Sequence, residues 1–202
     1  MKCKHTVPMM MLLALGYSVC AQESTGKTNL NEVRISYGIL TMPEMFNSMM
    51  ATWSAIGISI SMDSVTDYNA SLHGVATLEY NRFVSKWLTV GGSMSINPIN
   101  TVLKTKSDLT LTWSYYVFNV MPKVNFYYVN KDMISLYSGI EAGLATIMWT
   151  DRQGNTTKTD FGFTTAFHVN AFGIRVGKQI GGFMEWGFGF RGVANFGLSA
   201  RF

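Results

Sequence analysis

The feature that most constrains the fold of this chain is an alternation of bulky apolar residues with small, polar or charged ones. A β-strand places successive side chains on opposite faces, so a period of two residues indicates a strand with one apolar and one polar face. We expect eight such strands, at about residues 32–41, 72–83, 87–97, 111–129, 133–149, 160–176, 184–191 and 194–202.

The two faces of these strands differ in size as well as in polarity. The segment 184–191, for example, sets Met184, Trp186, Phe188 and Phe190 against Glu185, Gly187, Gly189 and Arg191. In a soluble barrel the bulky face fills the interior, whereas in a membrane barrel it meets lipid and the interior is polar. Charges that share a face with glycine fit the crowded lumen of a narrow barrel. The sequence therefore predicts an all-β fold, an eight-stranded antiparallel transmembrane up-and-down barrel.

Composition supports this orientation. Charged residues make up 14% of the chain, against about 25% in soluble domains.

In the expected strand at 160–176, the alternation slips by one residue near Gly173, which a β-bulge would explain.

The connections between the expected strands alternate in length. Those after the second, fourth and sixth strands are short, whereas 42–71 and 98–110 are long and 150–159 is of middle length. The link near Gly192 is short. This asymmetry is typical of periplasmic turns and external loops. Within the first long link, residues 43–56 have helical spacing after Pro43, which predicts a short helix that caps the barrel mouth or lies at the membrane surface; the alternative is a mobile loop.

The first residues have the pattern of a secretory signal peptide. Lys2 and Lys4 precede an apolar stretch at 7–17, and Val19-Cys20-Ala21 offers a cleavage site. The stretch is too short for the roughly 20 residues of a spanning helix, and the residues before Cys20 match a lipoprotein signal poorly. We expect a signal peptide at 1–21, a short periplasmic segment at 22–31 and the barrel at 32–202. Cleavage removes both cysteines, Cys3 and Cys20, and with them any disulfide.

The final segment, Phe196-Gly197-Leu198-Ser199-Ala200-Arg201-Phe202, resembles the C-terminal insertion signal of outer-membrane barrels. Together with the alternation and the signal peptide, it makes the chain similar to the small eight-stranded family that includes OmpA-type and OmpX-type barrels. The resemblance implies the outer membrane of a Gram-negative-type envelope, with outer-membrane lipid around the barrel. It also implies that the barrel-assembly machinery recognises Phe196, Leu198, Ala200 and Phe202.

Seven charges fall on the inward face, and they are the candidate site residues. They are Arg34, Glu79, Lys123, Glu141, Arg175, Glu185 and Arg201. Their signs interleave around the barrel: Glu79 lies next to Arg34, Lys123 lies next to Glu141, and Glu185 lies between Arg175 and Arg201. Buried charges need partners, so an ion-pair network is expected in the lumen. Rearrangement of these pairs would gate a small pore.

Other chemistry finds little support. The two histidines after residue 21, His73 and His168, are expected at a strand end and in the lumen, without a serine nucleophile and base at suggestive spacing. Neither cysteine pairs nor spaced histidine pairs indicate a metal site. The formal charge of +4 falls by two when Lys2 and Lys4 leave, which gives no reason to expect nucleic acid. We expect no catalytic residue, cofactor or metal.

Three functions stay open. The first is a structural or surface-interaction protein whose external loops meet lipid, a host surface, another envelope component or an unidentified surface ligand. The second is a small passive pore. The third, a soluble secreted barrel that binds an apolar ligand, requires the opposite facing of the two sides.

Overall fold

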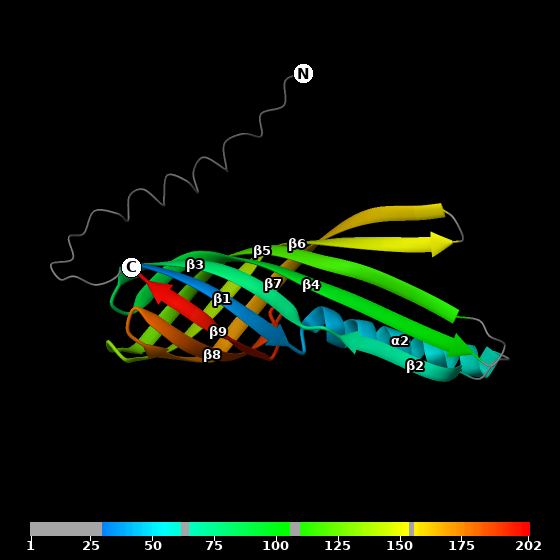
Figure 1. The fold of residues 1–202 in the computed structure, drawn as a ribbon, viewed down its shortest axis with the longest axis horizontal. Helices are drawn as coiled ribbons and strands as arrows, with labels where there is room; N and C mark the ends of the chain where they lie inside the picture. The colour runs from blue at the N-terminus through cyan, green and yellow to red at the C-terminus, as the bar shows by residue number, and fades with distance from the viewer. Residues whose placement is uncertain (1–29, 62–64, 106–109, 154–155) are drawn as a thin grey trace, which may run out of the picture.

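The computed structural model describes residues 30–61, 65–105, 110–153 and 156–202, which form a closed antiparallel β-barrel and one helix (Figure 1). The elements are β1 (Asn31–Ile39), α2 (Met42–Ser61), β2 (Val65–Leu72), β3 (Val75–Ser85), β4 (Leu88–Thr105), β5 (Thr110–Asn130), β6 (Ile134–Gln153), β7 (Thr156–Gly177), β8 (Ile180–Gly189) and β9 (Ala194–Arg201). The predicted signal peptide, and all but the last residues of the segment 22–31, lie outside the described residues.

Nine strands fill eight positions in the barrel. β3 pairs with Leu88–Ile96 of β4, and β2 pairs with the continuation of β4 from Ile99 to Thr105. β2 and β3 thus follow one another along a single position, separated at Gly74, whose φ of 71° suits glycine. The ring closes because β1 pairs with both β3 and β9, and β4 pairs with β5. The predicted all-β, eight-stranded antiparallel barrel is confirmed.

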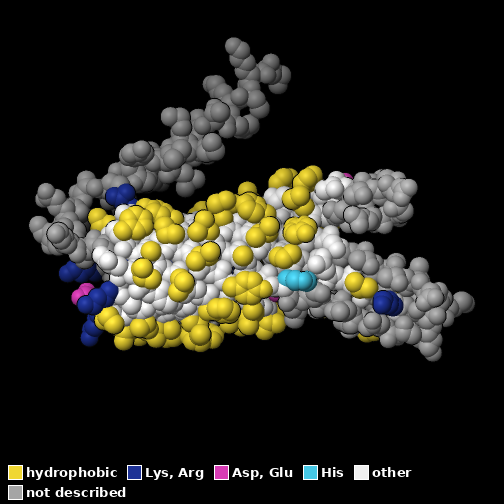
Figure 2. All heavy atoms as spheres, in the orientation of Figure 1, with side chains coloured by type: hydrophobic (Ala, Val, Ile, Leu, Met, Phe, Trp, Pro, Cys, Tyr) yellow, Lys and Arg dark blue, Asp and Glu magenta, His cyan; other side chains and the backbone are white. Residues whose placement is uncertain are grey.

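The bulky face of each strand points outward. In β1, Ile35 is 63% exposed while Arg34 beside it is fully buried. Figure 2 shows hydrophobic side chains spread over the visible side of the barrel. Such an exterior suits contact with lipid rather than water. The soluble-barrel alternative is wrong in its facing, because it required these side chains to fill the interior.

The wall of the barrel has unequal height. β8, β9 and β1 have 10, 8 and 9 residues and form a low wall, whereas β5, β6 and β7 have 21, 20 and 22. Together with β2 and β4, these long strands form a tall wall that continues past the low wall, away from the C-terminus (Figure 1). A strand of about 9–11 residues suffices to span a bilayer, and the long strands have about ten residues more, which is about 35 Å along the strand at ~3.4 Å per residue.

The expectation of a long loop at 98–110 and of a link of middle length at 150–159 was wrong. β4 continues to Thr105 and β5 begins at Thr110, while β6 and β7 reach Gln153 and Thr156. These segments pair as strands although their sequences lack the alternation.

The long link at 42–71 holds α2 and β2. The predicted helix is confirmed, although it extends to Ser61. Its first turn lies at the barrel mouth, the end of the barrel opposite the short turns. The rest of the helix packs against β2 and β4. It points along the barrel, not across the mouth as a cap would (Figure 1).

The remaining local predictions agree with the structure. Short turns join β3 to β4, β5 to β6 and β7 to β8. The bulge predicted near Gly173 is confirmed: the register of β7 with β8 shifts between Asn170 and Phe172, and Ala171 and Phe172 both face outward.

Candidate functional site

The interior of the barrel holds two connected groups of charges. In the group nearer the mouth, Lys123 Nζ lies 2.6 Å from a Glu79 oxygen and 3.2 Å from a Glu141 oxygen. Arg191 pairs with the same two carboxylates and lies 3.0 Å from Glu185. These side chains are at most 1% exposed, so each charge depends on its protein partners.

The second group lies toward the short turns and is centred on Glu32. Its carboxylate contacts Arg34 at 2.9 Å, Arg175 at 3.0 Å and Arg201 at 3.3 Å. Arg34 joins the two groups, because it also contacts Glu185 at 3.0 Å. The hydroxyls of Tyr127 and Tyr137 accept further hydrogen bonds from Arg34.

The structure places all seven predicted charges in the interior, but their partners differ from the predicted neighbours. Arg34 and Glu79 face each other across β1 and β3, yet within the described residues Arg34 forms its ion pairs with Glu32 and Glu185. Lys123 does contact Glu141 as expected. Arg175 and Arg201 were expected to flank Glu185, and they lie against Glu32 instead.

Sequence reasoning left two members out of the network. Glu32 lies two residues before Arg34 and shares its face, so the alternation was sufficient to find it. Arg191 was assigned to the inward face but not to the network. Its neighbour Phe190 was expected outward and is buried, because the backbone turns at Gly189 with φ of 136°. Both Phe190 and Arg191 therefore point inward.

Each carboxylate in this network contacts at least two cations. Five cations meet four carboxylates, and loss of one partner from a buried pair typically costs about 3–5 kcal/mol. Glycines make room for the large side chains. A Cβ at Gly173 would lie 2.6 Å from the Tyr137 ring, and one at Gly187 would lie 2.9 Å from His168. The network thus holds the interior in one arrangement.

A layer of mixed side chains lies on the mouth side of the charges; beside the buried polar Asn97, Thr101 and Asn119, it contains an apolar cluster. The buried members of this cluster are Ile99, Val117, Met121, Ala145, Ala166 and Phe190. Met42, at the start of α2, packs against this cluster together with Tyr115 and Ile147. The alternation predicted a polar lumen throughout and missed this cluster. The ion-paired charges and this cluster are buried in the lumen, so the geometry gives no support to the pore.

α2 is fastened at its polar side. Its first turn has a capping box, in which Glu44 accepts a hydrogen bond from the Thr41 backbone N–H at 2.9 Å and Thr41 Oγ1 accepts one from the Glu44 N–H at 3.3 Å. Glu44 also accepts a hydrogen bond from the Gly74 N–H at 2.7 Å. One turn later, Asn47 donates to Thr101 of β4 at 2.7 Å. The helix is therefore held against the tall wall by buried polar contacts.

The opposite side of α2 is apolar and exposed. We call it the helix apolar face; it consists of Met45, Phe46, Met49, Met50, Trp53, Ile56 and Ile60. α2 contains neither Lys nor Arg, and its single acid, Glu44, is buried. In the part of the chain that the structure describes, no helix has the length and hydropathy needed to cross a membrane.

The two histidines after residue 21 lie where the sequence predicted them, in the lumen and at a strand end. Among the described residues, no group of three or more His, Cys, Asp or Glu side chains is arranged to hold a metal ion. His168 is buried in the lumen, opposite Glu141 in the strand register. His73 lies between β2 and β3, at a strand end.

The terminal strand β9 closes the barrel between β8 and β1. Phe196, Leu198, Ala200 and Phe202 are exposed on its outer side.

Comparison with known proteins gives structural likeness without a sequence match. No protein-family model matches the chain, and no curated protein matches it. A similar solved structure is the crystal structure of Ail, the attachment invasion locus protein of Yersinia pestis, in complex with the heparin analogue sucrose octasulfate. The identity is 12%, the match covers 85% of this chain and 97% of that chain, and the TM-score is 0.39.

Proposed function

We propose that this chain is an integral barrel of the outer membrane of a Gram-negative-type cell that presents a protein-binding surface outside the membrane. The observation that carries the proposal is the helix apolar face, which lies exposed beyond the low wall while the other side of α2 is fastened to the tall wall. The barrel is the anchor, and the ion-paired lumen keeps it rigid.

The direction and charge of α2 favour a protein partner over lipid. Helices that lie on membranes run in the interface plane and carry Lys or Arg on their polar side. α2 instead runs along the barrel, away from the low wall (Figure 1), and has no basic residue. A groove on a protein that accepts an amphipathic helix has the complementary chemistry.

The size of the helix apolar face makes burial against a partner favourable. Fully burying a Phe or Met side chain is worth about 1.5–3 kcal/mol, and Trp53 is 65% exposed. Because the capping box and Asn47 already fix the helix, binding does not have to order it, which preserves affinity.

The test is site-specific photocrosslinking in the native host. A photoreactive residue at position 53 should give one discrete protein adduct, whereas the same residue at Ile140, on the lipid-facing exterior of β6, should not. Phe46→Glu should abolish the adduct. Ser54→Glu, an exposed change on the same helix outside the helix apolar face, should leave it intact. Crosslinks to lipid alone, or an adduct insensitive to Phe46→Glu, would refute the proposed surface.

The membrane assignment has its own test. The protein should need detergent to stay monodisperse, and the folded barrel should migrate differently on gels before and after boiling. We also propose that Phe196, Leu198, Ala200 and Phe202 form the signal read by the barrel-assembly machinery, supported by their exposure on the closing strand. Phe202→Ala should lower the amount of assembled barrel in cells without changing the stability of refolded protein.

A further inference from the structure

The end of the barrel with the short turns carries a ring of exposed cations. Lys86, Lys131 and Lys178 lie one in each of the three turns, and Arg82 lies near the end of β3. The exposed acid in these turns is Asp132. Figure 2 shows Lys and Arg side chains gathered at one end of the apolar exterior. We call these four residues the cationic rim.

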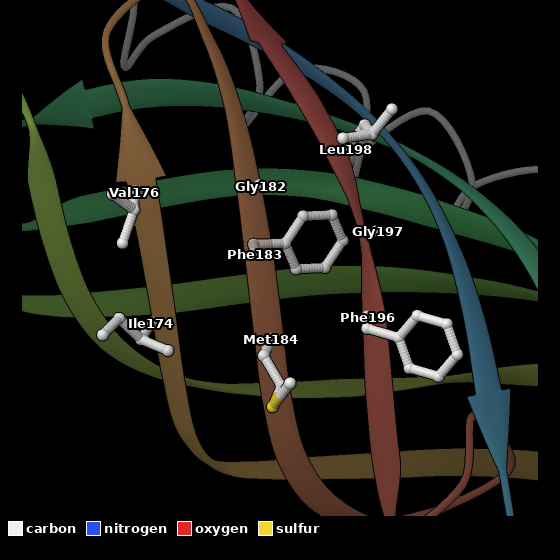
Figure 3. A pocket seen from close by; sticks show the side chains of 8 residues that line it. All are labelled: Ile174, Val176, Gly182, Phe183, Met184, Phe196, Gly197 and Leu198. Atoms are coloured by element: carbon white, nitrogen blue, oxygen red, sulfur yellow. The ribbon is translucent and has the colours of Figure 1, made fainter.

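An apolar groove lies on the exterior across β7, β8 and β9, and its residues Val176 and Gly182 flank the turn that carries Lys178. Its volume is ≈ 510 Å³. Gly182 faces outward on β8 between its cross-strand neighbours Val176 and Leu198, and the missing side chain leaves the groove open (Figure 3). A Cβ at Gly182 would meet only the Gly197 carbonyl oxygen, at 3.9 Å.

The turn that carries Lys178 joins the two strands beside the groove and is held by hydrogen bonds from inside the barrel. Arg175 donates hydrogen bonds to the carbonyl oxygens of Gly177, Lys178 and Gln179. The Arg201 backbone N–H donates to the Gln179 carbonyl at 2.8 Å. Lys178 lies two residues beyond Val176 of the groove, with its side chain exposed.

We propose that the groove and Lys178 form a binding site for an anionic glycerophospholipid, with an acyl chain along Gly182 and the phosphate at the Lys178 ammonium. Two features select this occupant. The groove is continuous with the apolar exterior, which suits an acyl chain. The nearby rim is cationic, which suits a lipid head group with a net negative charge. Each lysine near an anionic membrane surface strengthens binding about fivefold.

The inference goes beyond the proposed protein-binding surface and rests only on the proposal that the barrel is integral to a membrane. The experiment is native mass spectrometry of the full chain, refolded in a neutral detergent, with phosphatidylglycerol or phosphatidylcholine of identical acyl chains. Wild type should retain phosphatidylglycerol at least fivefold better. Lys178→Gln should remove most of this preference, whereas Lys131→Gln, the same charge change in another turn, should keep it.

The groove is tested by filling it. Gly182→Leu should abolish the tightly retained lipid of either kind, while Ala142→Leu, at an outward position on β6 outside the groove, should leave it unchanged. The gel shift between unheated and boiled samples verifies that each variant is folded.

Three results would overturn the inference: equal retention of both lipids by wild type, indifference to Gly182→Leu, or a wild-type dimer that Gly182→Leu dissociates, since the occupant would then be a second copy. If wild type needs no detergent, the membrane proposal itself fails. If it needs detergent but lacks the lipid preference, only this inference fails.

Discussion

Replacing Arg191 tests how much the buried ion pairs contribute to the stability of the barrel. Arg191 contacts Glu79, Glu141 and Glu185 inside the lumen, and Arg191→Met keeps much of its volume while removing the charge. Three buried carboxylates would then share Lys123 and Arg34. Removing one partner of a buried ion pair costs about 3–5 kcal/mol. At ~2 kcal/mol per molar urea, the unfolding midpoint should fall by about 2 M.

The assay is equilibrium urea unfolding of refolded protein, followed by tryptophan fluorescence and by loss of the gel shift. Lys86→Met, at an exposed turn, should leave the midpoint unchanged. Glu141→Gln should cost less in the Arg191→Met background than in wild type, with a coupling of about 1–3 kcal/mol. A loss below about 1 kcal/mol for Arg191→Met would refute the reasoning, because it would mean that water solvates these charges.

Gly173→Val should destabilise the barrel by about 1–3 kcal/mol through overpacking, because its Cβ would lie 2.6 Å from the Tyr137 ring; Gly182→Ala should not, and equal urea midpoints for the two variants would contradict the packing. Glu44→Ala should cost α2 about 1 kcal/mol of local stability, seen as faster hydrogen exchange over 42–61 with the barrel midpoint unchanged; unaltered exchange would show that the capping box is dispensable. In planar bilayers wild type should show no conductance steps, because the ion-paired charges and the apolar cluster are buried in the lumen; regular single-channel steps would restore the pore hypothesis.

The alternation predicted those parts of the fold that a membrane constrains. Inside the membrane, one face of every strand must be apolar, so strand positions, facing and the bulge near Gly173 were readable. Beyond the membrane this requirement ends. β2, with the sequence Val65-Thr-Asp-Tyr-Asn-Ala-Ser-Leu72, and the outer part of β4 have no such pattern, and they were taken for loops.

The candidate site was predictable as a set of positions but not as a set of pairs. Alternation assigns Arg34 and Glu185 to the interior, but it does not say that their long side chains meet across the lumen, 151 residues apart in sequence. That contact depends on strand tilt and stagger. The helix apolar face was visible as helical spacing, yet its fastening to Thr101 and Gly74 depends on strands that the pattern did not reveal.

Because the wall of the barrel has unequal height, the mouth is open on one side and walled on the other. The low wall of β8, β9 and β1 leaves one side open, while the strands that hold α2 stand behind it. On the proposed function, a partner that diffuses within the plane of the membrane would therefore dock from this open side. Binding would then require the barrel to be rotated about the membrane normal so that its open side faces the partner, whereas a symmetric cylinder would bind in any rotation. Complexes should form with one partner per barrel.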